Sequence, residues 1–411
     1  MSNMTLSEEL EWRGLVKDKT FPDLSWLNTP QAFYLGIDCT ADSLTVGNLA
    51  VFLLAKKLLL SGWKTVLLVG GATTMVGDPG GKDDERQLLS RDQIATNVAA
   101  IKVQVKNLFS NQDFTLVDNY DWFKGIEYLD FLRDIGKHYS MTELLQRDYI
   151  SERMGENGSG ISYAEFSYSL IQGYDYLHLF KEYGVVLQIG GSDQWGNMLS
   201  GVPLIRKKEG IEVQAMSMPL VMNKTTGVKF GKSEEGAVWL DLNKTSILDF
   251  YQFWINVNDN DAPDYLKIYT TLNKDEIDRI VEKHLAEPSA RHAQSVLADE
   301  ITRLVHGAEA TEKAKQATAV LVGGNSNDAE AVEGLPHRRV AVPANVVDLL
   351  LDLELVSSKS EARRLINGGG IYVDGKSINK ENLDTDDFNN GKLIIRRGKA
   401  FKDSALIELN K

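Results

Sequence analysis

The chain has few of the residues that build disulfides and metal centres. Its 411 residues include one cysteine, Cys39, and six histidines. A single cysteine cannot form an internal disulfide, and scattered histidines without a second cysteine argue against a structural zinc site. We therefore expect no metal that is held by protein ligands.

Long apolar runs are also missing. No run approaches the roughly 18 to 20 residues that a membrane-spanning helix needs. Residues 1–13 are polar and acidic, whereas a secretory signal is basic and then apolar. We expect a cytoplasmic protein with no membrane partner.

Positive charge is scarce in the chain as a whole. The 45 Lys and Arg residues face 58 Asp and Glu residues, a net charge of −13, which by itself argues against a nucleic-acid partner. However, residues 341–411 hold 11 of each sign, which leaves 34 basic against 47 acidic residues in the first 340. A neutral tail on an acidic body leaves room for a local basic surface, which is what an RNA contact requires.

The first part of the chain alternates apolar, strand-like segments with helical ones, the pattern of a parallel sheet covered by helices. Residues 32–37 and 65–69 predict buried strands, and the segment 48–60 between them predicts a buried helix. Two glycine-rich segments, 70–74 and 77–82, predict turns after the second strand. This β-α-β unit indicates a nucleotide-binding α/β fold.

The pattern changes further along the chain. Residues 83–180 are mostly helical, and a short strand at 185–189 leads into the loop 190–193, at the strand end where α/β sheets bind ligands. Near the end of the chain, Asp374 and Gly375 predict a hairpin turn. The predicted domains are a Rossmann-like catalytic domain at 1–220 with a helical insertion at about 105–180, a mobile lysine-containing loop at 221–245, an α-helical domain at 246–322, a linker at 323–341 and a small α+β domain at 342–411.

Two loops carry residues suited to phosphate. In the loop 36–48, backbone amides at a helix N-terminus attract phosphate, and its glycines allow close approach. In the second loop, Lys229 and Lys232 would stabilise charge that develops on a pyrophosphate leaving group, and Lys82 and Arg86 would join them. An ordinary βα turn and a solvated lysine turn explain the same residues without a ligand.

A third group of polar residues lies on one predicted helix. Tyr168, Gln172 and Asp175 are spaced by four and three residues, so a helix presents them on one face. If Tyr34 and Asp78 converge with them, that face forms a polar amino-acid pocket. A half-buried helix face with no ligand is the alternative interpretation.

Together these motifs resemble those of the bacterial tyrosyl-tRNA synthetases. The matching segments, which follow that family's order and spacing, are 34–44, 69–73, 77–79, 168–175, 188–197 and 229–233. The tail from about residue 342 resembles the S4-type RNA-binding domain of the same enzymes. The resemblance implies an α/β fold with a Rossmann-like parallel sheet, a helical domain and an S4-type domain. It implies activation of L-tyrosine by ATP and transfer to the 3' end of tRNA(Tyr).

The resemblance also implies roles for individual residues. Tyr34 and Asp175 would hydrogen-bond the substrate phenol. The other predicted tyrosine-binding residues, the first three of which would hold the ammonium group, are Asp78, Tyr168, Gln172, Gln188 and Gln194. The predicted ATP-binding residues are Gly36, Asp38, Gly47, Asn48, Gly191, Asp193, Leu220 and Val221. The predicted catalytic residues, most of them around the β- and γ-phosphates, are Thr40, Thr45, Lys82, Arg86, Lys229 and Lys232.

Three further partners are implied in the same way. Mg²⁺ would enter with the ATP phosphates rather than occupy a protein cage. A second copy of the chain would form a homodimer through residues 110–150, where Trp122, Phe123, Phe131 and Leu132 supply apolar surface or, equally, core. The tRNA would contact a basic face of the C-terminal domain, for which an ordinary solvated surface is the alternative. The residues of that face are Lys359, Arg363, Arg364, Arg396 and Arg397.

The chain departs from the family at the start of the buried helix. The signature there is His-Ile-Gly-His or close to it, whereas this chain has Thr45-Val46-Gly47-Asn48. The Asn48 carboxamide can imitate one imidazole donor, but the Thr45 hydroxyl is shorter and carries no charge. Losing one transition-state donor typically costs about 3 to 4 kcal/mol. Either Thr45 reaches the phosphate through water, or the cations listed above stabilise the transition state instead. Leu35 and Cys39 also depart from the family, which commonly has Cys and Pro at these two positions.

These departures leave two rival functions. An RNA-binding paralogue that has lost adenylation would explain Thr45 and Asn48, but it has no reason to keep a complete amino-acid pocket. A tryptophan-specific relative is disfavoured because an indole has no use for the pair Tyr34 and Asp175.

Overall fold

The chain folds into two compact units. The computed structural model describes residues 4–78, 88–154, 160–224, 227, 230–233, 236–323, 336–398 and 403–410. The first unit comprises residues 1–244 and 258–293, and the second comprises residues 245–257 and 294–411. Within the described residues, no helix is both long enough and apolar enough to cross a bilayer.

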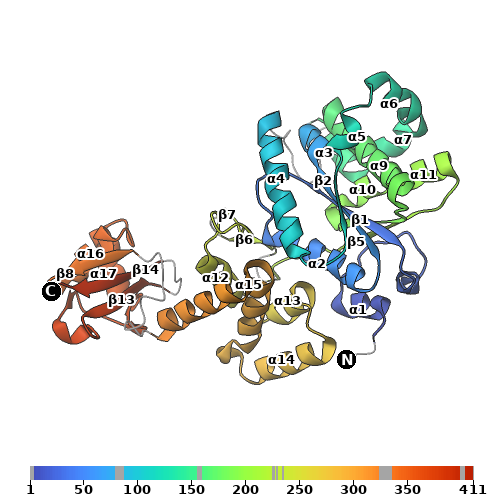
Figure 1. The fold of residues 1–411 in the computed structure, drawn as a ribbon. Helices are drawn as coiled ribbons and strands as arrows, with labels where there is room; N and C mark the ends of the chain where they lie inside the picture. The colour runs from blue at the N-terminus through green and yellow to red at the C-terminus, as the bar shows by residue number, and fades with distance from the viewer. Residues whose placement is uncertain are drawn as a thin grey trace. The chain divides into compact units, whose positions relative to one another are not determined.

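A five-stranded parallel sheet forms the centre of the first unit (Figure 1). Its strand order is β3-β2-β1-β4-β5. Its strands are β1 (Ala32–Asp38), β2 (Lys64–Gly70), β3 (Thr115–Asp118), β4 (Leu187–Gly191) and β5 (Gln214–Met218). Because β1 lies between β2 and β4, the strand order reverses at β1. Crevices at such a reversal are where α/β proteins bind ligands. The predicted α/β class is confirmed.

Helices cover this sheet, which explains the apolar sequences of β1 and β2. Tyr34 of β1 and Leu68 of β2 share a core cluster with Tyr176 of α9 (Tyr163–Tyr183) and Leu204 of α11 (Gly201–Glu209). Helix α2 (Val46–Leu60) is apolar nearly all round, and it contacts β2, β4 and α13 (Ala262–Tyr269). The other elements of the unit are α1 (Leu6–Arg13), α3 (Gly71–Val76), α4 (Arg91–Leu108), α5 (Tyr120–Phe123), α6 (Tyr128–Asp134), α7 (Met141–Leu145), α8 (Asp148–Met154), α10 (Trp195–Met198), α14 (Lys274–Ala286), β6 (Lys232–Ser233) and β7 (Gly236–Ala237).

The glycine pair after β2 was predicted as a turn, and this prediction is wrong. Helix α3 begins at Gly71, directly after the strand. A Cβ on Gly71 would lie 2.4 Å from Asp118 Oδ1, and a Cβ on Gly70 would lie 2.6 Å from Asp38 Oδ1. The two glycines therefore permit close packing between neighbouring strand ends rather than a turn.

The region 246–322 is helical, as predicted, but it does not stay in one unit. Residues 258–293 belong to the first unit, whereas α12 (Ile247–Ile255) and most of α15 (His292–Gly323) belong to the second. The reason is visible at Arg13 of α1, whose guanidinium donates to the main-chain oxygens of Lys267, at 2.7 Å, and Thr270, at 3.4 Å. These bonds tie α13 to the N-terminal helix.

The C-terminal part of the second unit is a mixed sheet in the order β11-β10-β13-β14-β8. Strand β8 (His337–Val340) pairs with β14 (Ser404–Leu409), so the sheet begins inside the range predicted as linker. The predicted hairpin turn is confirmed, because Asp374 and Gly375, with φ of 45° and 75°, join β10 (Ile371–Val373) to β11 (Lys376–Ser377). The remaining elements are β9 (Ala344–Asn345), α16 (Val346–Asp352), α17 (Lys359–Asn367), β12 (Asn382–Leu383) and β13 (Lys392–Arg397).

The packing of α11 on α9 gives a test of the fold. A Cβ on Gly201 would lie 2.7 Å from both Cβ and Cδ1 of Tyr176, so Gly201→Ala should lower the free energy of unfolding by about 1–3 kcal/mol. Gly125→Ala is the control, because a Cβ on Gly125 meets nothing within 4 Å. Urea denaturation followed by tryptophan fluorescence measures both. Equal stability of the two variants would contradict the close approach of the helices.

Candidate active site

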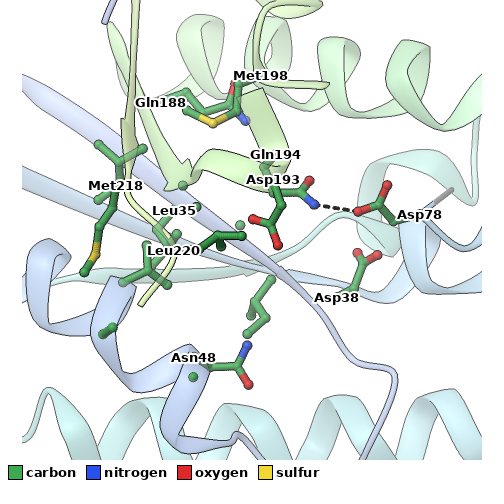
Figure 2. Close-up of a pocket in the computed structure, with 18 of the residues that line it drawn as sticks. Leu35, Asp38, Asn48, Asp78, Gln188, Asp193, Gln194, Met198, Met218 and Leu220 are labelled. Carbon is green, nitrogen blue, oxygen red and sulfur yellow. Dashed lines mark hydrogen bonds between the residues drawn. The ribbon is translucent and has the colours of Figure 1, made fainter. Parts of the chain in front are cut away.

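A cavity of about 540 Å³ opens at the carboxyl ends of β1 and β4 (Figure 2). Its walls come from the loop after β1, the start of α2, the face of α9 and the residues after β4. The predicted site residues that line it are Tyr34, Gly36, Asp38, Thr40, Thr45, Gly47, Asn48, Asp78, Tyr168, Gln172, Asp175, Gln188, Gly191, Asp193, Gln194, Leu220 and Val221. Lys82, Arg86 and Lys229 lie outside the described residues, as does the side chain of Lys232.

The floor of the cavity holds a phenol and a carboxyl group. Tyr34 is 1% exposed, and no described residue hydrogen-bonds to its hydroxyl. Burial raises the pKa of the Tyr34 phenol, and the nearby Asp175 carboxyl raises it further. A buried hydroxyl without a partner costs about 1–3 kcal/mol, so this group is prepared for a ligand that can bond to it.

Asp175 is held in place by two donors that sequence reasoning missed. Asn119 Nδ2 donates to Asp175 Oδ2 at 3.1 Å, and Trp122 Nε1 donates to Oδ1 at 2.9 Å. Burial nevertheless raises the pKa of the Asp175 carboxyl from 3.8 to about 8. Both donors follow strand β3, which the sequence did not reveal, so their place at a strand end was hidden.

The contacts of Trp122 distinguish between its two predicted roles, which are apolar surface at a dimer interface and core. Its indole nitrogen faces Asp175, and its ring stacks on His178 with centroids 4.3 Å apart. Phe123 and Phe131 contact the ring of Tyr174 on α9. These contacts favour the core interpretation for the three aromatic residues.

A second polar network lies at the side of the cavity. Asp78 is buried and accepts a hydrogen bond from Gln194 Nε2 at 2.5 Å (Figure 2). It accepts a second one from Asn197 Nδ2 at 3.1 Å. Asn197 also donates to Gln194 Oε1 at 3.3 Å. Sequence reasoning missed Asn197, although it ends the 188–197 segment. It fixes the positions of two predicted substrate-binding groups at once.

Asp38 connects the helix face to the sheet. Tyr168 donates its hydroxyl to Asp38 Oδ2 at 2.9 Å, and Thr73 donates to Oδ1 at 2.7 Å. No described residue bonds to the buried side-chain oxygens of Gln172 and Gln188. The cavity thus presents two more acceptors that a ligand with N–H or O–H groups would satisfy.

The predicted basic face of the C-terminal domain is not one face. Consecutive residues of a strand point to opposite sides of a sheet, so Arg396 and Arg397 of β13 are separated. Arg396 lies over the ring of Tyr372, 5.0 Å from its centroid. Arg397 forms an ion pair with Asp403 at 3.1 Å. Arg397 also pairs with Glu361 of α17 at 3.7 Å. Arg396 and Arg397 therefore do not share one side of the sheet, and RNA binding by the five cations stays a prediction.

Two of the three cations of α17 also have partners. Lys359 pairs with Asp348 at 2.8 Å, and Arg363 pairs with Glu381 at 3.5 Å. All four side chains are more than 40% exposed, so these pairs are weak and open to exchange with another anion.

Comparison with known proteins identifies the family. The model of the tRNA synthetases class I (W and Y) matches residues 27–322. The chain belongs to this family. A model of the tyrosine–tRNA ligase SYY-like C-terminal domain matches residues 328–402.

Individual members of the class I family agree with this assignment. The chain is 41% identical to "Tyrosine--tRNA ligase" of Limosilactobacillus fermentum, over 96% of this chain and 98% of that protein. It is 41% identical to "Tyrosine--tRNA ligase 2" of Bacillus cereus, over 99% and 100%. Among solved structures, a C-terminally truncated mitochondrial tyrosyl-tRNA synthetase of Aspergillus nidulans matches with a TM-score of 0.69 and 31% identity, covering 78% of this chain and 94% of that one. The resemblance to tyrosyl-tRNA synthetases is confirmed.

The raised pKa of Asp175 predicts how stability depends on pH. Between about pH 4 and pH 8 the folded protein keeps a proton that the unfolded chain loses, so the free energy of unfolding falls as the pH rises through this range. Above pH 8 this contribution is constant. Asp175→Asn removes the titration, so the difference in stability between the two proteins should change steadily from pH 5 to pH 8 and then level off. Parallel pH profiles of the two proteins, measured by urea denaturation, would contradict the raised pKa.

Proposed function

We propose that the chain activates L-tyrosine with ATP to form tyrosyl-adenylate and then transfers the tyrosyl group to the 3' end of tRNA(Tyr). The observation that carries this proposal is the buried floor of the cavity, where the unpaired hydroxyl of Tyr34 and the carboxyl of Asp175 lie. Relatives 41% identical over nearly the full chain are named tyrosine–tRNA ligases, which supports it.

The floor residues recognise the phenol of the substrate. Tyr34 and Asp175 together offer a hydroxyl and a carboxyl to the substrate hydroxyl, which can both donate and accept. Phenylalanine would leave the buried Tyr34 hydroxyl unpaired, and a site of this kind rejects such an analogue by roughly 10⁴ to 10⁵. An indole places no hydroxyl there, which disfavours tryptophan as the substrate.

The side of the cavity would hold the other end of the amino acid. Asp78 and the neighbouring Tyr168 and Gln172 would receive the ammonium group. Gln194, which Asn197 already orients, would lie near the carboxylate. These contacts would bring one carboxylate oxygen of the substrate to the α-phosphorus of ATP. The enzyme would then accelerate the reaction by holding the two reactants in place, without a covalent enzyme intermediate.

ATP would occupy the opposite wall. Gly191 and Asp193 would bind the ribose, and the backbone at Leu220 and Val221 would face the adenine. The tyrosine carboxylate forms a bond to the α-phosphorus while the bond from that phosphorus to the bridging oxygen breaks, and pyrophosphate departs with the electron pair. The predicted cations and Mg²⁺ that enters with the phosphates would stabilise this charge. In the second step, a ribose hydroxyl of the tRNA attacks the tyrosyl carbonyl carbon, and AMP leaves.

We also propose that the chain works as a homodimer. Large apolar side chains are exposed in and beside the predicted interface at 110–150: Tyr128 is 60% exposed, Leu129 75% and Met141 57%. Tyr163, 62% exposed, has its hydroxyl 3.3 Å from that of Tyr128, which extends the same surface. A monomer rarely exposes so many large apolar groups together, so a second copy is the proposed cover.

Tyrosine-dependent exchange of labelled pyrophosphate into ATP tests the proposed function. A folded protein that shows exchange with tyrosine, and far less with phenylalanine or tryptophan, supports adenylation. An RNA-binding paralogue would bind tRNA and give no exchange with any amino acid.

Removal of the Tyr34 hydroxyl tests the assigned specificity. Tyr34→Phe should reduce the preference for tyrosine over phenylalanine by at least about tenfold, because the buried hydroxyl that phenylalanine leaves unpaired is gone. The measurement is kcat/KM for exchange with each amino acid. Tyr183 packs against the core cluster that contains Tyr34 but does not line the cavity, so the control variant Tyr183→Phe should keep the preference for tyrosine. Unchanged selectivity of Tyr34→Phe would refute the contact.

The role of the lysine loop is tested by comparing the adenylation rate with the affinity for tyrosine. Lys232→Ala should lower kcat for adenylation by about 10² to 10³ while the KM for tyrosine changes little, because the contact forms in the transition state. Lys224→Ala is the control, since Lys224 forms an ion pair with Asp264 and does not line the cavity. A loss confined to tyrosine affinity would mean that Lys232 does not act in the transition state.

A further inference from the structure

The first turn of α2 carries two side chains that hydrogen-bond to each other. Thr45 is the N-cap residue, and its Oγ1 donates to Asn48 Oδ1 at 2.8 Å. The backbone nitrogen of Thr45 donates to the same oxygen at 2.9 Å. In return, the backbone nitrogen of Asn48 donates to Thr45 Oγ1 at 3.4 Å. The two residues that depart from the family signature are therefore one reciprocal capping box.

This pair decides which way the Asn48 carboxamide faces. The backbone N–H of Thr45 is a donor, so the atom opposite it must be the amide oxygen, because the reverse orientation would set two donors against each other. The amide nitrogen is left on the other side. Figure 2 shows it on the side of the cavity that holds Asp193, with the oxygen turned away.

The hydroxyl of Thr45 has a single proton, and that proton is committed to Asn48. Thr45 therefore has no donor left for a phosphate oxygen or a bridging water while the pair is intact. Asn48 Nδ2, in contrast, carries two protons and lines the cavity. Of the two side chains, it is the one that offers donors to a nucleotide.

Backbone contacts on both sides fix the same turn. Val46 N donates to Val238 O at 2.9 Å, and Leu240 N donates to Leu44 O at 2.8 Å. Gly231, with φ of 100°, lies so close that a Cβ there would be 2.8 Å from the backbone nitrogen of Gly47. The start of the helix is thus anchored independently of the side-chain pair, and loss of the Thr45 hydroxyl should leave the turn in place while it removes one of the two hydrogen bonds that hold the Asn48 amide oxygen.

We propose that Thr45 is a positioning residue that acts on ATP only through Asn48, whose carboxamide it turns toward the cavity. Where the family signature has two histidines that can each donate a hydrogen bond, this chain has one donor, Asn48, and one residue that orients it, Thr45. This inference rests on the proposed function, because adenylation is its main readout.

A double-mutant cycle on the full chain tests this inference, with pyrophosphate exchange as the assay. Thr45→Val should lower kcat/KM for ATP by about tenfold or more and leave the KM for tyrosine within about twofold, whereas Thr45→Ser, which keeps the donor, should retain most activity. Because Thr45 acts only through Asn48, the double variant Thr45→Val/Asn48→Ala should be no slower than Asn48→Ala alone, within about twofold. Thr45→His alone should also lose activity, since it breaks the pair.

Two kinetic results would overturn the proposal: losses that multiply in the double variant, or a gain in activity in Thr45→His. If Thr45→Val fails to fold, Thr45→Gly replaces it, because glycine is tolerated at an N-cap. If the unsubstituted protein shows no exchange, the proposed function fails, and a crystal structure of the Thr45 variant then tests the pair by itself. A rotated or disordered Asn48 amide supports the pair, and an unchanged amide contradicts it.

Discussion

The account depends on the burial of a phenol hydroxyl next to a carboxyl group at the floor of one cavity. Tyr34 and Asp175 are 1% and 2% exposed, and the Tyr34 hydroxyl has no partner among the described residues. The unpaired Tyr34 hydroxyl destabilises the empty protein, since it lacks the water that it had in the unfolded chain. A ligand with a hydroxyl at the right position relieves that cost. Specificity for tyrosine and the instability of the empty site therefore have the same physical origin.

The fold holds this pair on rigid elements. Tyr34 lies in the central strand β1, and Asp175 lies in the long helix α9, where Asn119 and Trp122 fix both of its oxygens. Among the described residues proposed for ATP, Thr40 comes from the loop after β1, and Thr45 and Asn48 come from the start of α2. The proposed recognition of the substrate phenol needs a fixed geometry, which the sheet and a long helix provide. The cavity at the reversal of strand order brings these residues together with Tyr34 and Asp175.

The sequence predicted the cavity well where local spacing determines geometry. Tyr168, Gln172 and Asp175 share a helix face because of their spacing, and the structure brings them to one cavity. The sequence could not predict which residues hydrogen-bond to the cavity-lining side chains and hold them in place. Asn119 follows β3, a four-residue strand of intermediate burial with no clear apolar pattern, and Asn197 acts through contacts with Asp78 and Gln194 that no local pattern encodes.

Other errors arose where tertiary packing replaced a local rule. Gly70 and Gly71 were interpreted as a turn, but their lack of a Cβ serves close contact with Asp38 and Asp118. Arg396 and Arg397 were placed on one surface, but strand alternation separates them. Asn48 was interpreted as a substitute donor and Thr45 as a shorter, uncharged one, each acting by itself, whereas the structure shows that the two residues bond to each other.

A crystal structure of the chain with L-tyrosine bound tests the central claim most directly. The account predicts the phenolic oxygen of the ligand within hydrogen-bond distance of both the Tyr34 hydroxyl and an Asp175 oxygen, with the ammonium group beside Asp78. Tyrosine bound elsewhere, or a phenol that reaches neither floor residue, would contradict it.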